Sequence, residues 1–168
     1  MDRGRLRDIL HRFRRSRAFP WLRDLVRQVS YLAAEPQDTV ARASVLFTMR
    51  VAGVAIGQAR LNLYPEARGE MAGAWLVGLY VHPLFRRMGL GRDLTLAVIR
   101  EARTRQQGVL RLFVREDNTA ARRLYEELGF TVIPTAGTAE EERKRLEALE
   151  GEPHVAMGLE LVHTGDTD

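Results

Sequence analysis

The sequence predicts an α+β fold built on a mixed sheet whose first half is antiparallel. Three observations support this prediction. Residues 43–50 and 54–63 are apolar-rich segments on either side of a short Gly-containing turn, as in a β-hairpin. Residues 74–81 form a near-continuous apolar run, which is typical of a central strand covered on both faces. Helix-like and strand-like segments then alternate, which indicates a mixed sheet with helices packed on it.

The N-terminal segment has a helical pattern. Apolar residues at i, i+3, i+4 and i+7 predict an amphipathic helix over residues 3–16, within a basic segment 1–18: Leu6, Ile9, Leu10 and Phe13. Pro20 suits the first turn of a second helix, and its apolar stripe continues to just before Pro36. No first strand is evident in residues 1–35.

The remaining elements are predicted from the spacing of apolar residues and from the Gly residues that end helices. We expect a helix over residues 90–107, a strand over 109–115, a helix over 119–128, and strands over 130–134 and 154–162. Gly108 and Gly129 are suited to end the two helices. Between the last two strands, Thr138 and Glu141 have the spacing of a capping box and predict a charged helical insertion within residues 135–152.

Composition sets the broad class. With 168 residues, 45% of them hydrophobic and 29% charged, the chain suits a single domain with a substantial core. It contains no Cys, which excludes disulfides, thiolate metal sites and a Cys nucleophile. The four His residues do not share a metal-ligand spacing, so we expect no metal. No apolar run reaches the length of a membrane span and no signal peptide is evident, so we expect a cytoplasmic protein.

The charge distribution is uneven. The net charge is +4, and 25 of the 26 basic residues are Arg. A GC-rich genome gives this bias without functional meaning. Residues 1–28 hold nine Arg against three Asp, which leaves nucleic acid, anionic lipid or an acidic protein surface as conceivable partners of that segment.

A glycine-containing turn carries the first chemical signal. Arg86-Arg87-Met88-Gly89-Leu90-Gly91 lies between the expected buried strand and the long helix. Glycines let a ligand approach the backbone closely, and the free N–H groups of a helix start attract anions. The turn therefore predicts a phosphate or pyrophosphate site, to which Arg86, Arg87 or Arg92 would add positive charge.

A second motif, Asn118 to Tyr125 and then Leu128-Gly129-Phe130, completes a recognisable pair. Together with Val81-His82-Pro83 and the Arg86-x-x-Gly89-x-Gly91 turn, it resembles the GNAT superfamily of acyl-CoA N-acyltransferases. The resemblance is clear over residues 40–134 and weak over residues 1–35. It implies a sheet with a splayed central strand pair, acetyl-CoA as co-substrate, an amine acceptor and often a homodimer.

The resemblance also implies roles for individual residues. The strand backbone of Leu79, Tyr80 and Val81 would pair with the pantetheine arm of acetyl-CoA. The turn would hold its pyrophosphate through the backbone of Arg87, Met88, Gly89, Leu90, Gly91 and Arg92, and the Arg86 side chain would add positive charge. Asn118 would contact pantetheine, and Tyr125 would protonate the departing thiolate as catalytic acid. Asn118 is also suited to be only a helix N-cap, and Tyr125 lies on the apolar stripe of its helix, where it would pack in the core.

The general base is open. In the branch that acetylates protein N-termini, a Glu commonly stands five residues before the Asn, and Phe113 occupies that position here. Glu70 is the favoured catalytic base because its loop borders the acceptor cleft in the family. Glu116, Tyr80 and His82 are the alternatives.

The insertion and the overall activity also leave alternatives. The helix at residues 138–151 carries five Glu and three basic residues. It forms either an acidic wall that attracts a cationic amine or a solvated helix whose charges pair with each other. For the whole chain we expect an N-acetyltransferase acting by direct attack, against two alternatives: a CoA-binding regulatory module without catalysis, and a basic-helix protein on nucleic acid or membrane.

Overall fold

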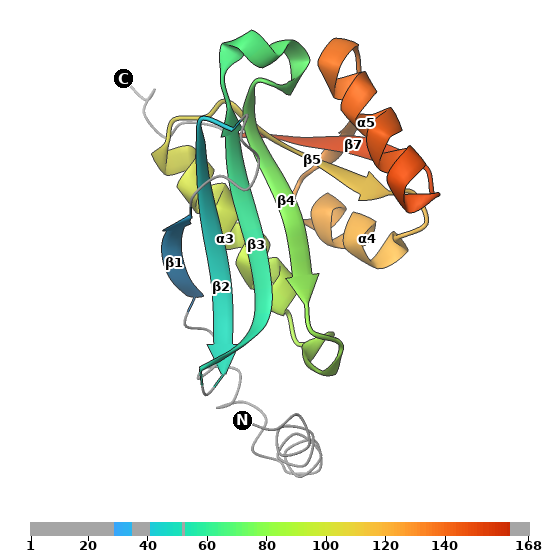
Figure 1. The fold of residues 1–168 in the computed structure, drawn as a ribbon. Helices are drawn as coiled ribbons and strands as arrows, with labels where there is room; N and C mark the ends of the chain where they lie inside the picture. The colour runs from blue at the N-terminus through green and yellow to red at the C-terminus, as the bar shows by residue number, and fades with distance from the viewer. Residues whose placement is uncertain (1–28, 35–40, 52, 162–168) are drawn as a thin grey trace.

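The fold is known from a computed structural model that describes residues 29–34, 41–51 and 53–161. Its centre is a seven-stranded sheet of order β1-β2-β3-β4-β5-β7-β6 (Figure 1). Four antiparallel strands form one half: β1 (Val29–Ala34), β2 (Ala43–Val51), β3 (Val54–Tyr64) and β4 (Gly73–Val81). The other half holds β5 (Val109–Arg115), β6 (Thr131–Ile133) and β7 (His154–Glu160). The expected α+β fold with a mixed sheet is confirmed.

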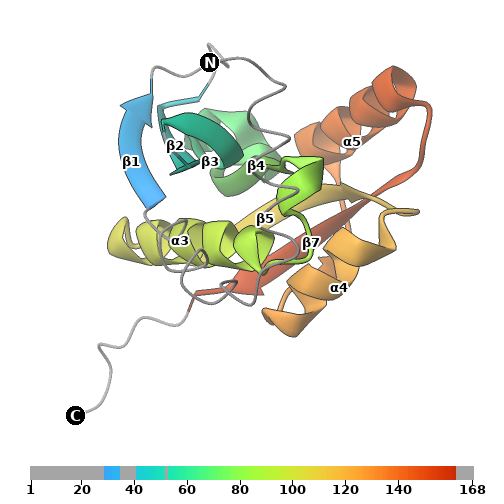
Figure 2. The ribbon, with the colours of Figure 1, turned by 90° about the horizontal axis from the view of Figure 1, so that it is seen from below.

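Helices cover both faces of the sheet. Figure 2 shows α3 (Leu90–Thr104) and α4 (Thr119–Glu127) on one face and α5 (Gly137–Glu150) on the other. Two short 3-10 helices, η1 (Glu66–Met71) and η2 (Pro83–Phe85), flank β4. The helices expected at residues 90–107, 119–128 and 135–152 are therefore all present, as are the expected strands.

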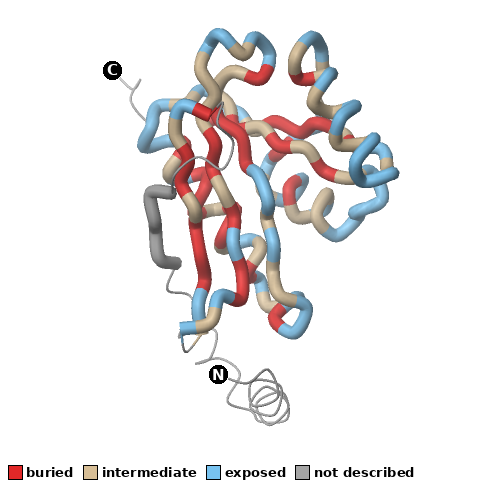
Figure 3. Tube along the Cα trace, viewed as in Figure 1, coloured by how far each residue is buried: buried red, intermediate tan, exposed pale blue. Residues whose placement is uncertain are grey.

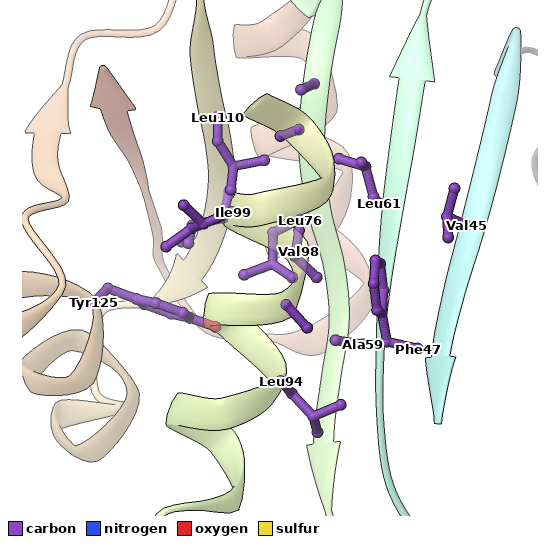
Figure 4. Packing of buried hydrophobic residues seen from close by; sticks show 14 of the residues in the cluster. Val45, Phe47, Ala59, Leu61, Leu76, Leu94, Val98, Ile99, Leu110 and Tyr125 are labelled. Atoms are coloured by element: carbon purple, nitrogen blue, oxygen red, sulfur yellow. The ribbon is translucent and has the colours of Figure 1, made fainter. Parts of the chain in front are cut away.

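The main core lies between the sheet and α3. Alternate residues of β2, β3 and β4 point toward this helix, and cross-strand neighbours such as Val45, Leu61 and Leu76 form continuous apolar rows. Leu94 and Val98 of α3 meet these rows and have no exposed surface (Figure 4). Figure 3 shows the resulting buried stripe along β2, β3 and α3. The period-2 pattern of the strands and the helical spacing of α3 therefore bury one face of each element.

The prediction for residues 20–35 is wrong over its last part. Residues 29–34 form the edge strand β1, which pairs antiparallel with β2 from Val29–Met49 to Ala34–Ser44. An apolar stripe of this length fits either a helix or a half-buried strand. Residues 29–34 form a strand because they pair with the edge of β2 that does not face β3. The helix expected over residues 3–16 lies outside the described residues.

The predicted capping box is also wrong. α5 begins at Gly137, and Ala136 occupies its N-cap position without a side-chain hydrogen bond that caps the helix. The Thr138 hydroxyl instead donates to the Arg68 carbonyl at 2.5 Å, and Glu141 is exposed. The spacing of Thr138 and Glu141 fits a capping box, but Thr138 forms its polar contacts with η1, a segment distant in the sequence.

Candidate active site

The central strands β4 and β5 separate early. They pair in parallel only at Ala74–Leu110 and Trp75–Arg111. Figure 1 shows them side by side at that end and diverging toward the end of β4, and the expected splayed pair is confirmed. Beyond Trp75, the edge of β4 that faces β5 has no strand partner among the described residues. Its N–H and C=O groups, including those of Leu79, Tyr80 and Val81, can accept an extended ligand as an additional strand.

A β-bulge marks the point of divergence. Between Gln58 and Arg60, β3 advances two residues while the paired β4 positions advance three, from Val77 to Tyr80. Gly78 has φ 63° there, a left-handed conformation that glycine adopts without strain. Val77 and Tyr80 are consequently 41% and 46% exposed. The prediction of a strand covered on both faces holds for Ala74, Trp75 and Leu76 and fails beyond them.

The glycine turn leads directly from this strand into α3. Gly89 is the N-cap of α3 in the left-handed conformation, with φ 82°. No side chain caps the helix among the described residues, so its first N–H groups face outward without an intrahelical acceptor. A Cβ built on Gly89 meets nothing within 4 Å, so the space beside this backbone is open. The geometry fits a pyrophosphate bound by backbone amides at the positive end of a helix dipole.

The arginines around the turn differ in what holds them. Arg86 donates from Nε to the Val81 carbonyl at 3.0 Å and so ties the turn to the end of β4. Arg87 is exposed and has φ 65°, the second left-handed residue of the turn. Arg92 lies on the first turn of α3, 3.8 Å from Glu127 of α4. Arg86 therefore shapes the turn, while Arg87 and Arg92 hold positive charge next to the helix start.

Asn118 lies at the start of α4, just after β5. Its Oδ1 accepts from the Ala121 N–H at 3.2 Å, which makes Asn118 the N-cap. The preceding Arg115–Asp117 pair, with N–O distances of 2.9 and 2.5 Å, fixes the turn, and the Arg115 hydrogen bond lowers the pKa of Asp117. The cap uses only the amide oxygen, so the Asn118 NH₂ group remains available as a donor toward a ligand.

Tyr125 points from α4 toward α3. Figure 4 shows its ring between the two helices, and it packs against Phe130 with ring centroids 5.6 Å apart. It is 5% exposed, and burial raises the pKa of Tyr125 to about 12. The hydroxyl therefore stays protonated at physiological pH and can act as a hydrogen-bond donor. The ring packs in the core, as the alternative interpretation expected, and this leaves the hydroxyl free for a second role.

A cavity of about 640 Å³ lies on the sheet face opposite α3. Its floor is formed by β3 and β4, including Arg60, Asn62 and Val77, and β4 is thus shared with the splayed edge. Phe113 and Trp75, stacked at 4.8 Å, form an aromatic wall. The residues of α5 that close it are Glu142, Arg145, Leu146 and Glu150. The cavity therefore reaches β4 from the side opposite the glycine turn.

Polar contacts at both ends hold α5 over this cavity. At its C-terminal part, Glu147 accepts from the His154 N–H at 3.0 Å and Arg143 donates to the His154 carbonyl at 3.4 Å, while Arg143 also pairs within the helix with Glu140 and Glu147. Glu142 pairs with Arg145 through bonds of 2.9 and 2.7 Å. These ion pairs favour the self-paired interpretation of the helix over a free acidic wall.

Glu70 anchors the other end of α5. Its carboxylate accepts from the Thr138 N–H at 3.2 Å, and it lies so close to Gly137 that a Cβ there would overlap with it. Hydrogen bonds from its own N–H and from that of Thr138 lower the pKa of Glu70. Glu70 does not line the cavity. This placement describes a helix cap and argues against Glu70 as the base.

The structure places the other base candidates apart from the cavity as well. Glu116 is exposed in the turn after β5. His82 accepts from the Leu84 N–H at 3.4 Å and caps η2. Tyr80 is exposed on the final part of β4. None of the three lines the cavity.

Sequence reasoning missed the polar residues on the cavity floor. Arg60 and Asn62 of β3 line this floor, Ser44 of β2 is hydrogen-bonded to both, and all three were interpreted only as strand residues. The signal that would have found them is their alternation with Val45, Ala59 and Leu61, which face the core. Polar residues at alternating positions on central strands indicate a second face that is not filled by core.

Comparison with known proteins agrees with this geometry. The model of the Acetyltransferase (GNAT) family matches residues 6–130. The chain belongs to this family. Among solved GNAT structures, the ribosomal-protein-S18-alanine N-acetyltransferase from Escherichia coli has a TM-score of 0.57 at 23% identity, over 83% of this chain and 98% of that one. YncA from Salmonella typhimurium, solved with its cofactor acetyl-CoA, has a TM-score of 0.55 at 25% identity, over 74% of this chain and 69% of that one.

Curated relatives share only part of their length with this chain. A mycothiol acetyltransferase from Thermobispora bispora is 41% identical over 88 residues, which are 51% of this chain and 29% of that protein. The chain thus spans less than a third of this relative.

Two further features are absent from the described residues. In these segments no helix is both long and apolar enough to cross a membrane. The described residues also contain no group of three or more His, Asp or Glu side chains placed to hold a metal ion.

Proposed function

We propose that this chain is an N-acetyltransferase that moves an acetyl group from acetyl-CoA to a primary amine by direct attack in a ternary complex. The observation that carries the proposal is the splay of β4 and β5, with the glycine turn on one side and the 640 Å³ cavity on the other. A donor bound along the edge of β4 and an acceptor bound in the cavity would meet at this strand. Family membership and the neighbour solved with acetyl-CoA support the choice of donor.

Different residues on the donor side would bind and orient different parts of acetyl-CoA. Acetyl-CoA supplies an activated acetyl thioester when bound. The amides at Gly89 to Arg92 would hold its pyrophosphate, and the open edge of β4 would align its pantetheine arm. The NH₂ group of Asn118 would fix that arm at the start of α4. Tyr125 would donate its phenolic proton, or a hydrogen bond, to the sulfur as the carbon–sulfur bond breaks.

The acceptor amine must lose a proton before or during attack. Among the carboxylates that line the cavity, Glu142 is paired with Arg145, whereas Glu150 lies against His154, with Oε2 3.4 Å from Nε2. We therefore propose Glu150, acting directly or through water, in place of Glu70. Phe113 stands where N-terminal acetyltransferases commonly carry Glu, so an acceptor other than a ribosomal protein N-terminus is favoured.

An acetyl-CoA-dependent thiol-release screen tests the proposed function. The amines are polyamines, amino acids, aminoglycosides and peptides with free N-termini, and the readout is free CoA with mass detection of the acetylated product. Turnover with at least one amine class is expected. Tight acetyl-CoA binding without turnover for any class would instead support the alternative, a CoA-binding module that lacks catalysis. Homodimer formation, cytoplasmic location and nucleic-acid binding by residues 1–28 stay predictions.

A further inference from the structure

Arg60 occupies the centre of the cavity floor. In the sheet register it lies between Leu46 of β2 and Val77 of β4, and these three residues share the face opposite α3. Val77 is the last β4 residue before the bulge, where β4 has already left β5. Arg60 therefore lies on the acceptor side, one strand away from the place where donor and acceptor are proposed to meet.

The contacts of Arg60 are all with neutral groups. Its guanidinium donates to Ser44 Oγ at 3.1 Å, Ser44 donates to Asn62 Oδ1 at 2.8 Å, and Asn62 Nδ2 donates to the Tyr64 hydroxyl at 3.3 Å. This chain of bonds orients the guanidinium on the floor. Within the described residues no carboxylate lies within ion-pair distance of Arg60, so none of its five N–H donors has an acidic partner there.

Three other charged residues at the cavity have polar partners. Arg145 and Glu142 neutralise each other through two bonds, and Glu150 lies against the His154 ring. Partial burial removes water from the guanidinium, and the single hydrogen bond to Ser44 replaces only part of that hydration without supplying a counter-charge. A ligand with an anionic oxygen group would supply that counter-charge, and a guanidinium binds carboxylate and phosphate through paired hydrogen bonds.

We propose that Arg60 binds an anionic group of the amine acceptor, so that the acceptor carries both an amine and a carboxylate or phosphate. This inference rests on the proposed function and adds a substrate class to it. The stacked Trp75–Phe113 wall and Leu146 would contact an apolar portion of the same molecule. An amine with an anionic group and an apolar side chain, such as an apolar amino acid, matches all three features of the cavity.

Matched pairs of acceptors test the role of Arg60. L-leucine is compared with L-leucinamide for a carboxylate, and phosphoethanolamine with ethanolamine for a phosphate, in wild type, Arg60→Gln and Arg60→Lys. In one of the pairs, Arg60→Gln is expected to lower the anionic-to-neutral ratio of kcat/KM at least tenfold, mainly through KM. Arg60→Lys should retain part of the ratio, because the charge remains while the paired geometry is lost. Comparing ratios between variants cancels the different basicities of the amines.

Two controls separate this inference from the proposed function. Arg103→Gln removes an exposed positive charge from α3, on the other side of the sheet, and should leave both ratios unchanged. Calorimetry with the same four compounds on CoA-saturated protein reads anion binding without turnover. If no amine is acetylated but Arg60→Gln still abolishes preferential binding of an anionic member, the proposed function fails and the Arg60 site stands. Equal preference in wild type and Arg60→Gln, by both methods, would overturn the inference.

Discussion

The two faces of the sheet hold their helices in different ways. α3 is attached by apolar contact: seven of its residues are buried, from Leu90 to Ala102. α5 buries one residue, Ala139, and is attached by polar contacts near its ends, with Glu70 and Arg68 at one end and with His154 at the other. One face is therefore a core that stabilises the fold, and the other is a wall that closes a cavity while burying little apolar surface.

This difference separates stability from specificity. Apolar burial supplies most of the free energy of folding, and half-exposed ion pairs supply little. We therefore expect substitutions on the α3 face to affect folding and donor binding, and substitutions on the α5 face to affect the acceptor cavity. The predictions below compare matched changes on the two faces.

Deletion of a buried side chain from α3 should give the largest change in stability. Leu94→Ala leaves a cavity in the main core and should lower the free energy of unfolding by about 3 kcal/mol. Leu149→Ala on α5 removes the same atoms from a residue that is 69% exposed. It should change the free energy of unfolding by less than about 0.5 kcal/mol. Urea denaturation of both variants gives the comparison. Similar losses in the two would show that α5 packs far more tightly than its contacts indicate.

Removal of the Tyr125 hydroxyl should affect turnover without affecting folding. Tyr125→Phe keeps the ring that packs against Phe130, and should lower kcat about tenfold or more, because a general acid contributes roughly 10²–10⁴ in rate. Acetyl-CoA affinity by calorimetry and the melting temperature should stay near wild type. Unchanged kcat would show that Tyr125 is only a core residue. Water would then be the candidate for the acid that protonates the departing thiolate.

The same contrast explains which features the sequence revealed. The spacing of Leu90, Leu94 and Val98 predicted α3, and the glycine turn and Asn118 were found because their signals are local. β1 was misassigned because residues 29–34 become a strand only when β2 offers an edge. The bulge at Gly78 depends on register between two strands, which single-sequence patterns do not contain.

The acceptor side was harder to predict for a related physical reason. The hydrogen bond between Glu70 and Thr138 makes Glu70 a cap of α5. The two residues are 68 positions apart, so this contact leaves no periodic signal in the sequence. The proposed role of Arg60 likewise depends on its hydrogen bond to Ser44 and on the cavity around it, neither of which the local sequence shows. Apolar periodicity reveals where an element buries a face, whereas polar sites depend on distant segments that folding brings together.

A β-branched residue in the glycine turn should weaken donor binding. Gly89→Val places a side chain in open space beside the helix start and should lower acetyl-CoA affinity at least tenfold, about 1.4 kcal/mol. Gly53→Val is the matched control, because Gly53 has φ 80° in the β2–β3 turn and equally open surroundings. Both variants bear the same backbone strain, so a loss of affinity confined to Gly89→Val isolates ligand approach. Equal affinity in the two folded proteins would remove the glycine turn from the donor site.

Glu70→Gln distinguishes a helix cap from a catalytic base. The amide oxygen can still accept from the Thr138 N–H, so kcat should stay within about threefold and only KM for the acceptor should rise slightly. Glu66→Gln, at an exposed position of the same short helix, is the control for charge. A fall in kcat of a hundredfold with unchanged KM would restore Glu70 as the base.

The smallest effect should be an acid-dependent loosening of α5. Hydrogen bonds from Arg143 and Thr135 lower the pKa of Glu140 from 4.5 to about 2. A carboxylate with a lowered pKa in the folded state stabilises that state above its unfolded pKa, and this contribution is lost as the pH falls from about 4.5 through about 2. Hydrogen exchange of the α5 amides should therefore accelerate over that range, relative to α3.

Arg143→Met tests the cause of this effect. Without the guanidinium, the pKa of Glu140 should return toward 4.5, and the difference in exchange between α5 and α3 should depend less on pH. Arg105→Met removes an arginine from the Glu101 ion pair at the end of α3, which it holds at 2.7 Å, and serves as the control. The α5 profile should not change in that variant. An unchanged pH dependence in Arg143→Met would mean that the Glu140–Arg143 pair does not set the acid sensitivity of α5.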